Sequence, residues 1–284
     1  MKIAIASGKG GTGKTFVATN LFYTAQESGI PVNLIDCDAE EPNVAEFIAG
    51  EVASCQNVFQ QIPVIDTSQC TYCGKCYEFC NYNAILFIRG NQFIRVLEEL
   101  CHDCGACLVA CKQGAITEKE KRIGTVRTIH PKKHTSIIEA RSEIGIHSPV
   151  PVIKKAIDTS APEVLTILDS PPGISCPFIA TVVPSDFVVL VTEPTPFGLN
   201  DLKLSVETLQ EIEKPFGVII NRSGLGNREV HHWLMENQIP LLMEIPFDRE
   251  IARIYSIGHI LSQEKPEYEK RFSDLLETIK KQWA

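Results

Sequence analysis

Two stretches of this chain place cysteine in the same pattern, and the pattern constrains the fold more than any other feature. The cysteines of the two stretches are Cys70, Cys73, Cys76 and Cys80, then Cys101, Cys104, Cys107 and Cys111. Both stretches read C-x2-C-G-x-C-x3-C-x3-A-I, which indicates an internal duplication. Cysteines this closely spaced indicate a ligand held by several thiolates rather than an ordinary hydrophobic core.

The spacing C-x2-C-x2-C-x3-C is typical of bacterial two-cluster iron–sulfur domains, in which the fourth cysteine of each run binds the other cluster. It predicts two [4Fe–4S] clusters. Their expected ligands are Cys70, Cys73, Cys76 and Cys111 for the first, and Cys101, Cys104, Cys107 and Cys80 for the second. Zinc is the alternative, because C-x2-C pairs also form zinc sites. The bacterial run ends in Cys-Pro, whereas Asn81 and Lys112 follow here, so we expect an altered turn without loss of the clusters.

A second motif, GKGGTGKT, lies between a strand-like run at Lys2–Ala6 and a helical stretch at Thr15–Ser28. This context is what a phosphate-binding loop requires, because its backbone N–H groups and the helix N-terminus attract anions. We expect Lys14 to reach the β- and γ-phosphates and Thr15 to bind Mg²⁺. The expected nucleotide contacts are Gly8, Gly10, Gly11, Thr12, Gly13, Lys14, Thr15 and Phe16.

Lys9 is not required in an ordinary loop of this type, and it makes the motif resemble that of the MinD/Mrp/nitrogenase-iron-protein superfamily. The resemblance covers the chain except the cysteine insert, with the hairpin after the insert left open. It implies an ATPase in which two subunits face each other and Lys9 stabilises charge on the partner's nucleotide. It also implies that Asp38 orients the attacking water and that Asp36 and Asp169 support Mg²⁺. The implied base contacts are Asn221, Arg222, Pro246 and Asp248.

Apolar, β-branched runs alternate with helical stretches in the rest of the chain, which predicts an α/β fold. We expect a P-loop NTPase with a mostly parallel sheet covered by helices on both faces. The expected strands are Lys2–Ala6, Val32–Asp36, Val164–Asp169, Phe187–Thr192, Phe216–Asn221 and Leu241–Ile245. The clearest helices are Thr15–Ser28, Leu202–Glu213 and Arg228–Glu236.

The alternating pattern fails between about Ile65 and Thr117, where the cysteine stretches and two short β-like runs, Ile85–Ile88 and Phe93–Val96, replace it. We interpret this region as an inserted bacterial-type two-cluster ferredoxin domain. Segments 122–130 and 135–141 are expected to form a hairpin that returns to the main sheet. The predicted organisation is residues 1–62 for the first part of the ATPase domain, 63–118 for the insert, and 119–284 for the second part.

Composition limits the partners and the compartment. A net charge of −8 argues against nucleic-acid binding, which needs a basic surface. The most apolar stretch, residues 178–191, is interrupted by Pro184 and Asp186, so no membrane insertion is expected. The strand-like start predicts no signal peptide, and eleven cysteines without one indicate metal ligands in a reducing cytoplasm.

Two residues near the predicted sites have open roles. Cys176 lies seven residues after Asp169. We expect it to be a buried thiol, the alternative being a ligating or reactive thiol near a dimer face. His102 adjoins a ligand cysteine and is expected to be solvated or to neighbour the ligands rather than to bind iron.

Together these features predict an ATPase, active as a homodimer, in which nucleotide state and dimer geometry gate electron transfer through the clusters to a redox or iron–sulfur partner. The cofactors would be ATP, Mg²⁺ and two [4Fe–4S] clusters. One alternative is a carrier ATPase that delivers clusters as cargo. The others are a MinD-like positioning or scaffold ATPase with redox-sensing clusters, and a nucleotide sensor with negligible turnover.

Overall fold

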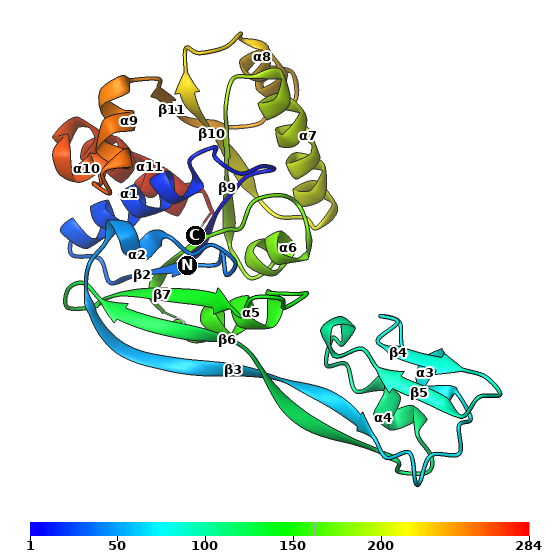
Figure 1. The fold of residues 1–284 in the computed structure, drawn as a ribbon. Coiled ribbons are helices and arrows are strands. Elements are labelled where there is room, and N and C mark those ends of the chain that lie inside the picture. The colour runs from blue at the N-terminus through cyan, green and yellow to red at the C-terminus, as the bar shows by residue number, and fades with distance from the viewer. Residues whose placement is uncertain (162, 284) are drawn as a thin grey trace.

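The fold is described by a computed structural model, which covers residues 1–161 and 163–283. Within these residues a nine-stranded sheet has the order β11-β10-β9-β1-β8-β2-β7-β6-β3, and β4 and β5 form a separate pair (Figure 1). The strands are β1 (Lys2–Ala6), β2 (Val32–Asp36), β3 (Glu51–Ile65), β4 (Ile85–Ile88), β5 (Phe93–Val96), β6 (Ile116–His130), β7 (Thr135–Ser142), β8 (Leu165–Asp169), β9 (Phe187–Thr192), β10 (Phe216–Ser223) and β11 (Leu241–Pro246).

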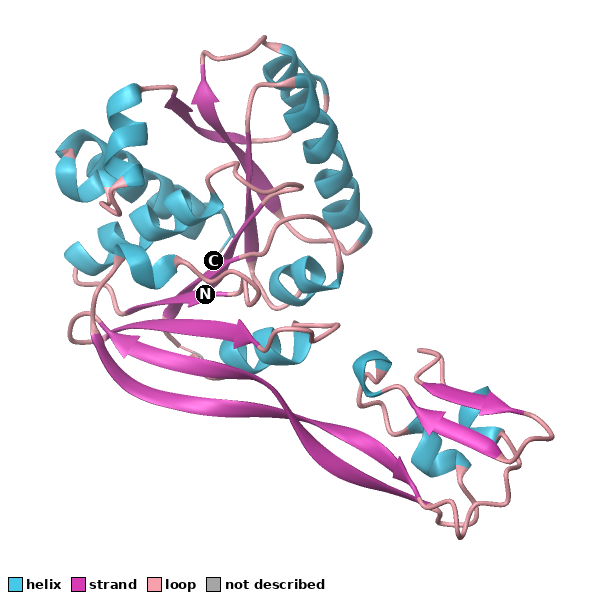
Figure 2. Cartoon of the chain, in the orientation of Figure 1, coloured by secondary structure: helices cyan, strands magenta, loops and turns pink. Residues whose placement is uncertain are grey.

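Helices cover both faces of the sheet (Figure 2). The helices are α1 (Lys14–Glu27), α2 (Val44–Phe47), α3 (Lys75–Glu78), the 3₁₀ helix η1 (Glu98–Leu100), α4 (Ala106–Ala110), α5 (Val150–Asp158), α6 (Cys176–Val182), α7 (Pro196–Glu211), α8 (Glu229–Glu236), α9 (Arg249–Ser256), α10 (Leu261–Glu264) and α11 (Pro266–Trp283). No helix in the described residues has the length and apolar character needed to cross a membrane.

The central strands are parallel and their side chains are buried on both sides. β1 pairs in parallel with β8 and β9, and β2 pairs in parallel with β7 and β8. One apolar layer includes Phe16 of α1 and Phe272 of α11. The opposite layer includes Phe178 of α6 and Leu202 of α7. The core therefore lies on both faces of the sheet, as the continuous apolar runs predict.

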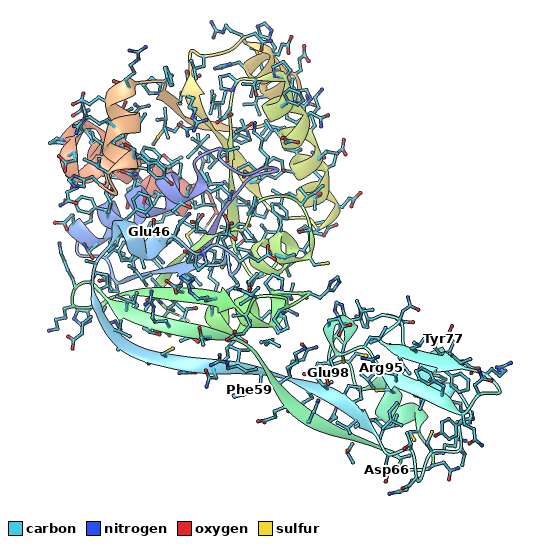
Figure 3. All side chains as sticks on the ribbon, viewed as in Figure 1. Glu46, Phe59, Asp66, Tyr77, Arg95 and Glu98 are labelled. Carbon is cyan, nitrogen blue, oxygen red and sulfur yellow. The ribbon has the colours of Figure 1, made fainter. Side chains whose placement is uncertain are left out.

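Strands β3 and β6 form a two-stranded arm that projects from the sheet (Figure 1). β6 pairs antiparallel with β3 along its length, but its pairing with β7 ends at Gly124. A bulge between Val58 and Phe59 of β3 lies beside this point. Residues 66–115 follow at the end of the arm, and we call them the head. Figure 3 shows Asp66 where the arm enters the head and Tyr77 at its far end.

The predicted central strands are present, and the hairpin after the insert does return to the sheet as β6 and β7. β3 was not expected. Its side chains from Glu51 to Asn57 are mostly exposed, and its buried positions in the arm include the polar Gln60, so its sequence does not alternate regularly between apolar and polar residues. Helix α7 begins six residues before the predicted Leu202, because Thr195 caps it by accepting a hydrogen bond from the Gly198 N–H. The boundaries predicted at 62/63 and 118/119 lie within β3 and β6.

Gly124 lies where the arm leaves the sheet, and close packing there leaves no room for a side chain. A Cβ atom at this position would lie 2.5 Å from the Arg141 carbonyl oxygen and 2.7 Å from Val152 Cγ2. We predict that Gly124→Ala lowers the free energy of unfolding by about 1–3 kcal/mol through overpacking. Chemical denaturation would measure it, with Thr117→Ala at an exposed position of β6 as the control. Equal stability of the two variants would contradict the prediction.

Candidate functional site

The loop between β1 and α1 is shaped by two close backbone approaches. Gly13 has φ 102° and precedes the first turn of α1. A Cβ on Gly13 would lie 2.3 Å from Asn221 Nδ2, and a Cβ on Gly8 would lie 2.5 Å from the Asp201 carbonyl oxygen. The Asn221 amide donates to the Thr12 carbonyl at 2.8 Å. The end of β10 therefore supports the loop directly, and larger residues would displace it.

A cavity of about 500 Å³ opens where this loop meets the carboxyl ends of the strands. Ligands in open α/β sheets bind at this edge. The predicted residues that line it are Gly10, Gly11, Gly13, Lys14, Thr15, Phe16, Asp38, Asn221, Arg222, Pro246 and Asp248. Gly8, Lys9, Thr12, Asp36 and Asp169 do not line it. Burial lowers the pKa of Lys14, and Asp169 and Asp38 oppose that effect.

Asp169 is placed as a Mg²⁺-supporting residue needs to be. Its Oδ2 accepts a hydrogen bond from the Thr15 hydroxyl at 2.6 Å, and its buried Oδ1 has no hydrogen-bond partner among the described residues. Burial raises the pKa of Asp169 to about 7, against the Thr15 hydrogen bond and the charge of Lys14. A cation would compensate for this cost, so the Thr15–Asp169 pair fits a Mg²⁺ site.

Asp36 is adjacent to Asp169 in the register of β2 and β8, but its oxygens have other partners. Oδ1 accepts from the Asp38 N–H at 3.1 Å, and Oδ2 accepts from the N–H groups of Asn43 and Val44 at 2.8 and 2.9 Å. Burial, and then the charge of Asp169, raises the pKa of Asp36. The contacts give Asp36 a structural task, which is to hold the loop 38–43 beside the cavity. Its support of Mg²⁺ stays a prediction.

Lys9 does not line the cavity of its own chain. Its Nζ lies 3.4 Å from Glu193 Oε2, and Glu193 also pairs with Arg222. Glu193 directly follows β9 and is buried. Within one chain, then, Lys9 is held by a carboxylate and makes no contribution to the cavity wall. Sequence reasoning missed Glu193, because its partners are far from it along the chain.

Loop 38–43 is also tied to the hairpin that continues into the arm. Asp38 lines the cavity, and burial raises its pKa. The next residue, Ala39, accepts two hydrogen bonds through its carbonyl oxygen, from Ser142 N–H at 2.7 Å and Ser142 Oγ at 3.0 Å. Ser142 is the last residue of β7. A displacement of this loop beside the nucleotide cavity would therefore also displace Ser142, at the end of the β6–β7 hairpin, or break its hydrogen bonds to Ala39.

Several residues that line the cavity have no motif in the sequence. These residues are Glu41, Asn43, Ile251, Ala252 and Tyr255, while Pro172 and Phe247, which also line the cavity, lie within segments that resemble the family's switch II and base-contacting loop. Tyr255 stacks on Phe47 with ring centroids 4.8 Å apart and meets Phe16 edge-on at 5.8 Å. Burial raises the pKa of Tyr255 to about 12, so its hydroxyl stays protonated. For the residues of the cavity wall that lie on α9, the only signal in the sequence is the apolar spacing of that helix, and an ordinary packed helix has the same spacing.

Two further hollows in the head are lined by the two predicted cysteine sets. The first, of about 130 Å³, is lined by Cys70, Cys73, Cys76 and Cys111 together with Gly74 and Ile116. The second, of about 20 Å³, is lined by Cys80, Cys101, Cys104 and Cys107 together with Tyr82 and His102. We call them cage one and cage two. In each, three cysteines come from one stretch and the fourth from the other, which is the grouping that bacterial two-cluster domains use.

The internal duplication is visible in the backbone. Tyr72 and Asp103 occupy equivalent positions, and both have φ 53°. The equivalent glycines, Gly74 and Gly105, have φ 78° and 69° and each precedes a short helix. Backbone N–H groups also approach sulfur, from Tyr72 to Cys70 at 3.4 Å and from Ala84 to Cys80 at 3.3 Å. These turns bring thiols and amide donors together, and such donors stabilise cluster sulfur.

The cysteine side chains are spread around these hollows. Among the described residues, no group of three or more His, Cys, Asp or Glu side chains is arranged to hold a metal ion. Burial raises the pKa of Cys107 to about 11 and also raises that of Cys76 and Cys101. These thiols are protonated at neutral pH, so binding a metal must release protons. With four cysteines and amide donors at each hollow, the donor set fits an iron–sulfur cluster.

Cys176 corrects one expectation. The sequence favours a buried thiol, but Cys176 is exposed at the first position of α6. It lines an apolar groove between α5 and α6. The reason is that the chain turns outward through residues 171–175 before α6 packs, so the apolar face of the helix begins at Phe178. Cys37, in contrast, is fully buried.

Comparisons with known proteins agree with the nucleotide site. The CobQ/CobB/MinD/ParA nucleotide binding domain matches residues 3–261. An uncharacterized protein of Methanocaldococcus jannaschii is 30% identical over 91% of this chain and 90% of its own length. The crystal structure of the cell division ATPase MinD of Pyrococcus furiosus has a TM-score of 0.60 at 21% identity and covers 99% of this chain and 98% of its own. The iron–sulfur cluster carrier protein of Pyrococcus abyssi is 44% identical, but over only 18% of this chain and 17% of its own.

The two lysines of the loop are predicted to differ in how much they contribute to nucleotide affinity. Lys14→Ala should weaken binding of a fluorescent ATP analogue roughly 10- to 150-fold, because a hydrogen bond to a charged group contributes about 1.5–3 kcal/mol. Lys9→Ala should leave that affinity within about threefold of wild type, because Lys9 does not line the cavity. Titrations of the two variants side by side would measure this, and a similar loss of affinity in both would contradict it.

Proposed function

This chain belongs to the CobQ/CobB/MinD/ParA nucleotide-binding family, and from that premise we propose that it hydrolyses ATP to gate electron transfer. In this proposal, nucleotide state and the geometry of a homodimer control access of a partner protein to two [4Fe–4S] clusters. The observation that carries the proposal is the grouping of four cysteines around each of two hollows. These hollows belong to the same chain as a complete phosphate-binding loop.

ATP would bind with its phosphates at the loop and its base toward the aromatic side chains that line the cavity, which are Phe16, Phe247 and Tyr255. Lys14 and the loop N–H groups would hold the phosphates, and Thr15 with Asp169 would hold Mg²⁺. Asp38 lines the cavity, where it would orient the attacking water. Phe247 and Tyr255, together with Asn221 and Arg222, would surround the base.

Dimerisation would give Lys9 its role. To reach the nucleotide of a partner chain, Lys9 must leave Glu193, which holds it at 3.4 Å. Exchange of that carboxylate for a phosphate would keep the ammonium group paired, so the cost of the move is small. The same exchange would leave Arg222 as the remaining partner of Glu193. Lys9 would then stabilise charge that develops on the transferred phosphoryl group.

The cysteines and backbone amides of the head would hold the clusters. Cage one would use Cys111 from the second stretch, and cage two would use Cys80 from the first. Bound clusters would supply one-electron transfer. The head lies at the end of the arm, with its far end directed away from the sheet (Figure 1). That placement leaves the head accessible to a second protein.

A carrier function is the second candidate, because the chain shares a short, 44% identical segment with an iron–sulfur cluster carrier protein. In that case the clusters would be cargo. Incubation of the anaerobically purified protein with an iron chelator, and separately with an apoprotein acceptor, distinguishes the two functions. Clusters that survive the chelator favour electron transfer, and clusters that pass to an apoprotein acceptor favour the carrier.

Double cysteine variants test the grouping of the cages. The wild-type protein, purified without oxygen, should contain about eight iron and eight sulfide per chain. Cys111→Ala combined with Cys70→Ala should remove only cage one and leave about four of each. Cys111→Ala combined with Cys101→Ala should damage both cages and leave almost none. Iron and sulfide assays would measure this, and the reverse pattern would show that each stretch binds its own cluster.

The gating itself is tested by electron transfer to an artificial acceptor. Mg-ATP should change the rate of cluster oxidation in the wild-type protein, and Lys14→Ala should abolish that change while keeping the cluster content. Stopped-flow absorbance of the reduced protein would measure the rate. Equal rates with and without Mg-ATP in the wild-type protein would refute gating.

A further inference from the structure

The head contacts the rest of the chain, the nine-stranded sheet with its covering helices and loops, which we call the ATPase body, at a second point besides the arm. The His102 ring stacks on Tyr82 with centroids 3.9 Å apart and meets the His147 ring edge-on at 5.9 Å. Tyr82 and His102 belong to the head, where both line cage two. His147 lies in the loop 143–149 between β7 and α5. The contact therefore joins the wall of cage two to the body.

The arm holds the same segment of the head from another side. Gln60 of β3 donates to the Cys101 carbonyl, and Asp103 accepts from the Gln61 N–H at 2.9 Å. Glu98 pairs with Lys119 of β6 at 2.6 Å, and Figure 3 shows Glu98 on the side of the head that faces the body. With Cys101 and Asp103 fixed by the arm, the ring of His102 is the part of this segment presented to His147.

The loop 143–149 is attached both to the base of the arm and to the body. The Glu143 N–H donates to the Ile123 carbonyl at 2.8 Å, and the Glu143 carboxylate pairs with Arg122 at 2.7 Å. Ile146 packs against the core layer that contains α5 and α6. At its start, the loop follows Ser142, which holds the Ala39 carbonyl beside the nucleotide cavity. The position of His147 is thus linked to loop 38–43 through a few residues.

We propose that loop 143–149 is a docking surface for cage two, and that His147 seats the head on the ATPase body through the ring of His102. His102 and His147 are both exposed side chains, so the contact is small and can open without disturbing either core. Loop 38–43, through Ser142, would set where this surface lies. The docking itself does not depend on the proposed function, which supplies only the reason for coupling it to ATP.

The test measures the distance between the head and the body. Spin labels on non-natural amino acids would replace Val109 of α4, 85% exposed, and Met235 of α8, 72% exposed. Pulsed electron–electron double resonance on the anaerobically purified, oxidised full chain should give a narrow distribution of distances between the two labels. His147→Ala should broaden the distribution and shift its mean. His147→Phe keeps an aromatic edge and should restore the narrow distribution.

Ile144→Ala is the control, because this side chain of the same loop is fully exposed, and it should behave as the wild type. A distribution in His147→Ala as narrow as the wild type and at the same mean would overturn the docking surface. The same labels with and without Mg-ATP separate the two proposals. A response to His147→Ala without any response to Mg-ATP upholds the docking and counts against gating.

Discussion

The two hydrogen bonds from Ser142 to the Ala39 carbonyl connect the two halves of this molecule. On one side lies the loop that Asp36 holds beside the nucleotide cavity through three backbone N–H groups. On the other side lies the β6–β7 hairpin, whose first strand continues into the arm and the head. A buried carboxylate that anchors backbone amides resists displacement, because each amide would otherwise lose its partner. The loop and the hairpin must therefore move together or break this connection.

Charge along the edge of the sheet extends the same connection. Asp169, Asp36 and Glu139 are register partners on β8, β2 and β7. Glu139 is buried and pairs with Arg127 of β6 at 2.8 Å and with Arg141 at 3.2 Å. The charge of Asp169 adds to the effect of burial in raising the pKa of Asp36, so a cation at Asp169 would ease the ionisation of Asp36. At the end of the row, Glu139 is linked through Arg127 to β6, which is one of the two strands of the arm.

The sequence predicted what depends on local chemistry. β1, β2 and β8 are continuous apolar runs because both of their faces are covered, and the cysteine grouping follows from spacing alone. β3 could not be predicted, because it is stabilised by backbone pairing with β6 and buries few side chains. Glu193, Tyr255 and His147 were also missed. Each acts through residues distant in sequence, and nothing beside them marks that role.

Hydrogen exchange with and without Mg-ATP tests the central claim most directly, because it reads the loop, the hairpin and the head in one experiment. The account predicts altered exchange in segments 38–43 and 142–149 and also in the head segment around His102, with no such response in Lys14→Ala. A response confined to the phosphate-binding loop and its cavity would contradict the account, since the nucleotide would then have no mechanical route to the cysteine cages.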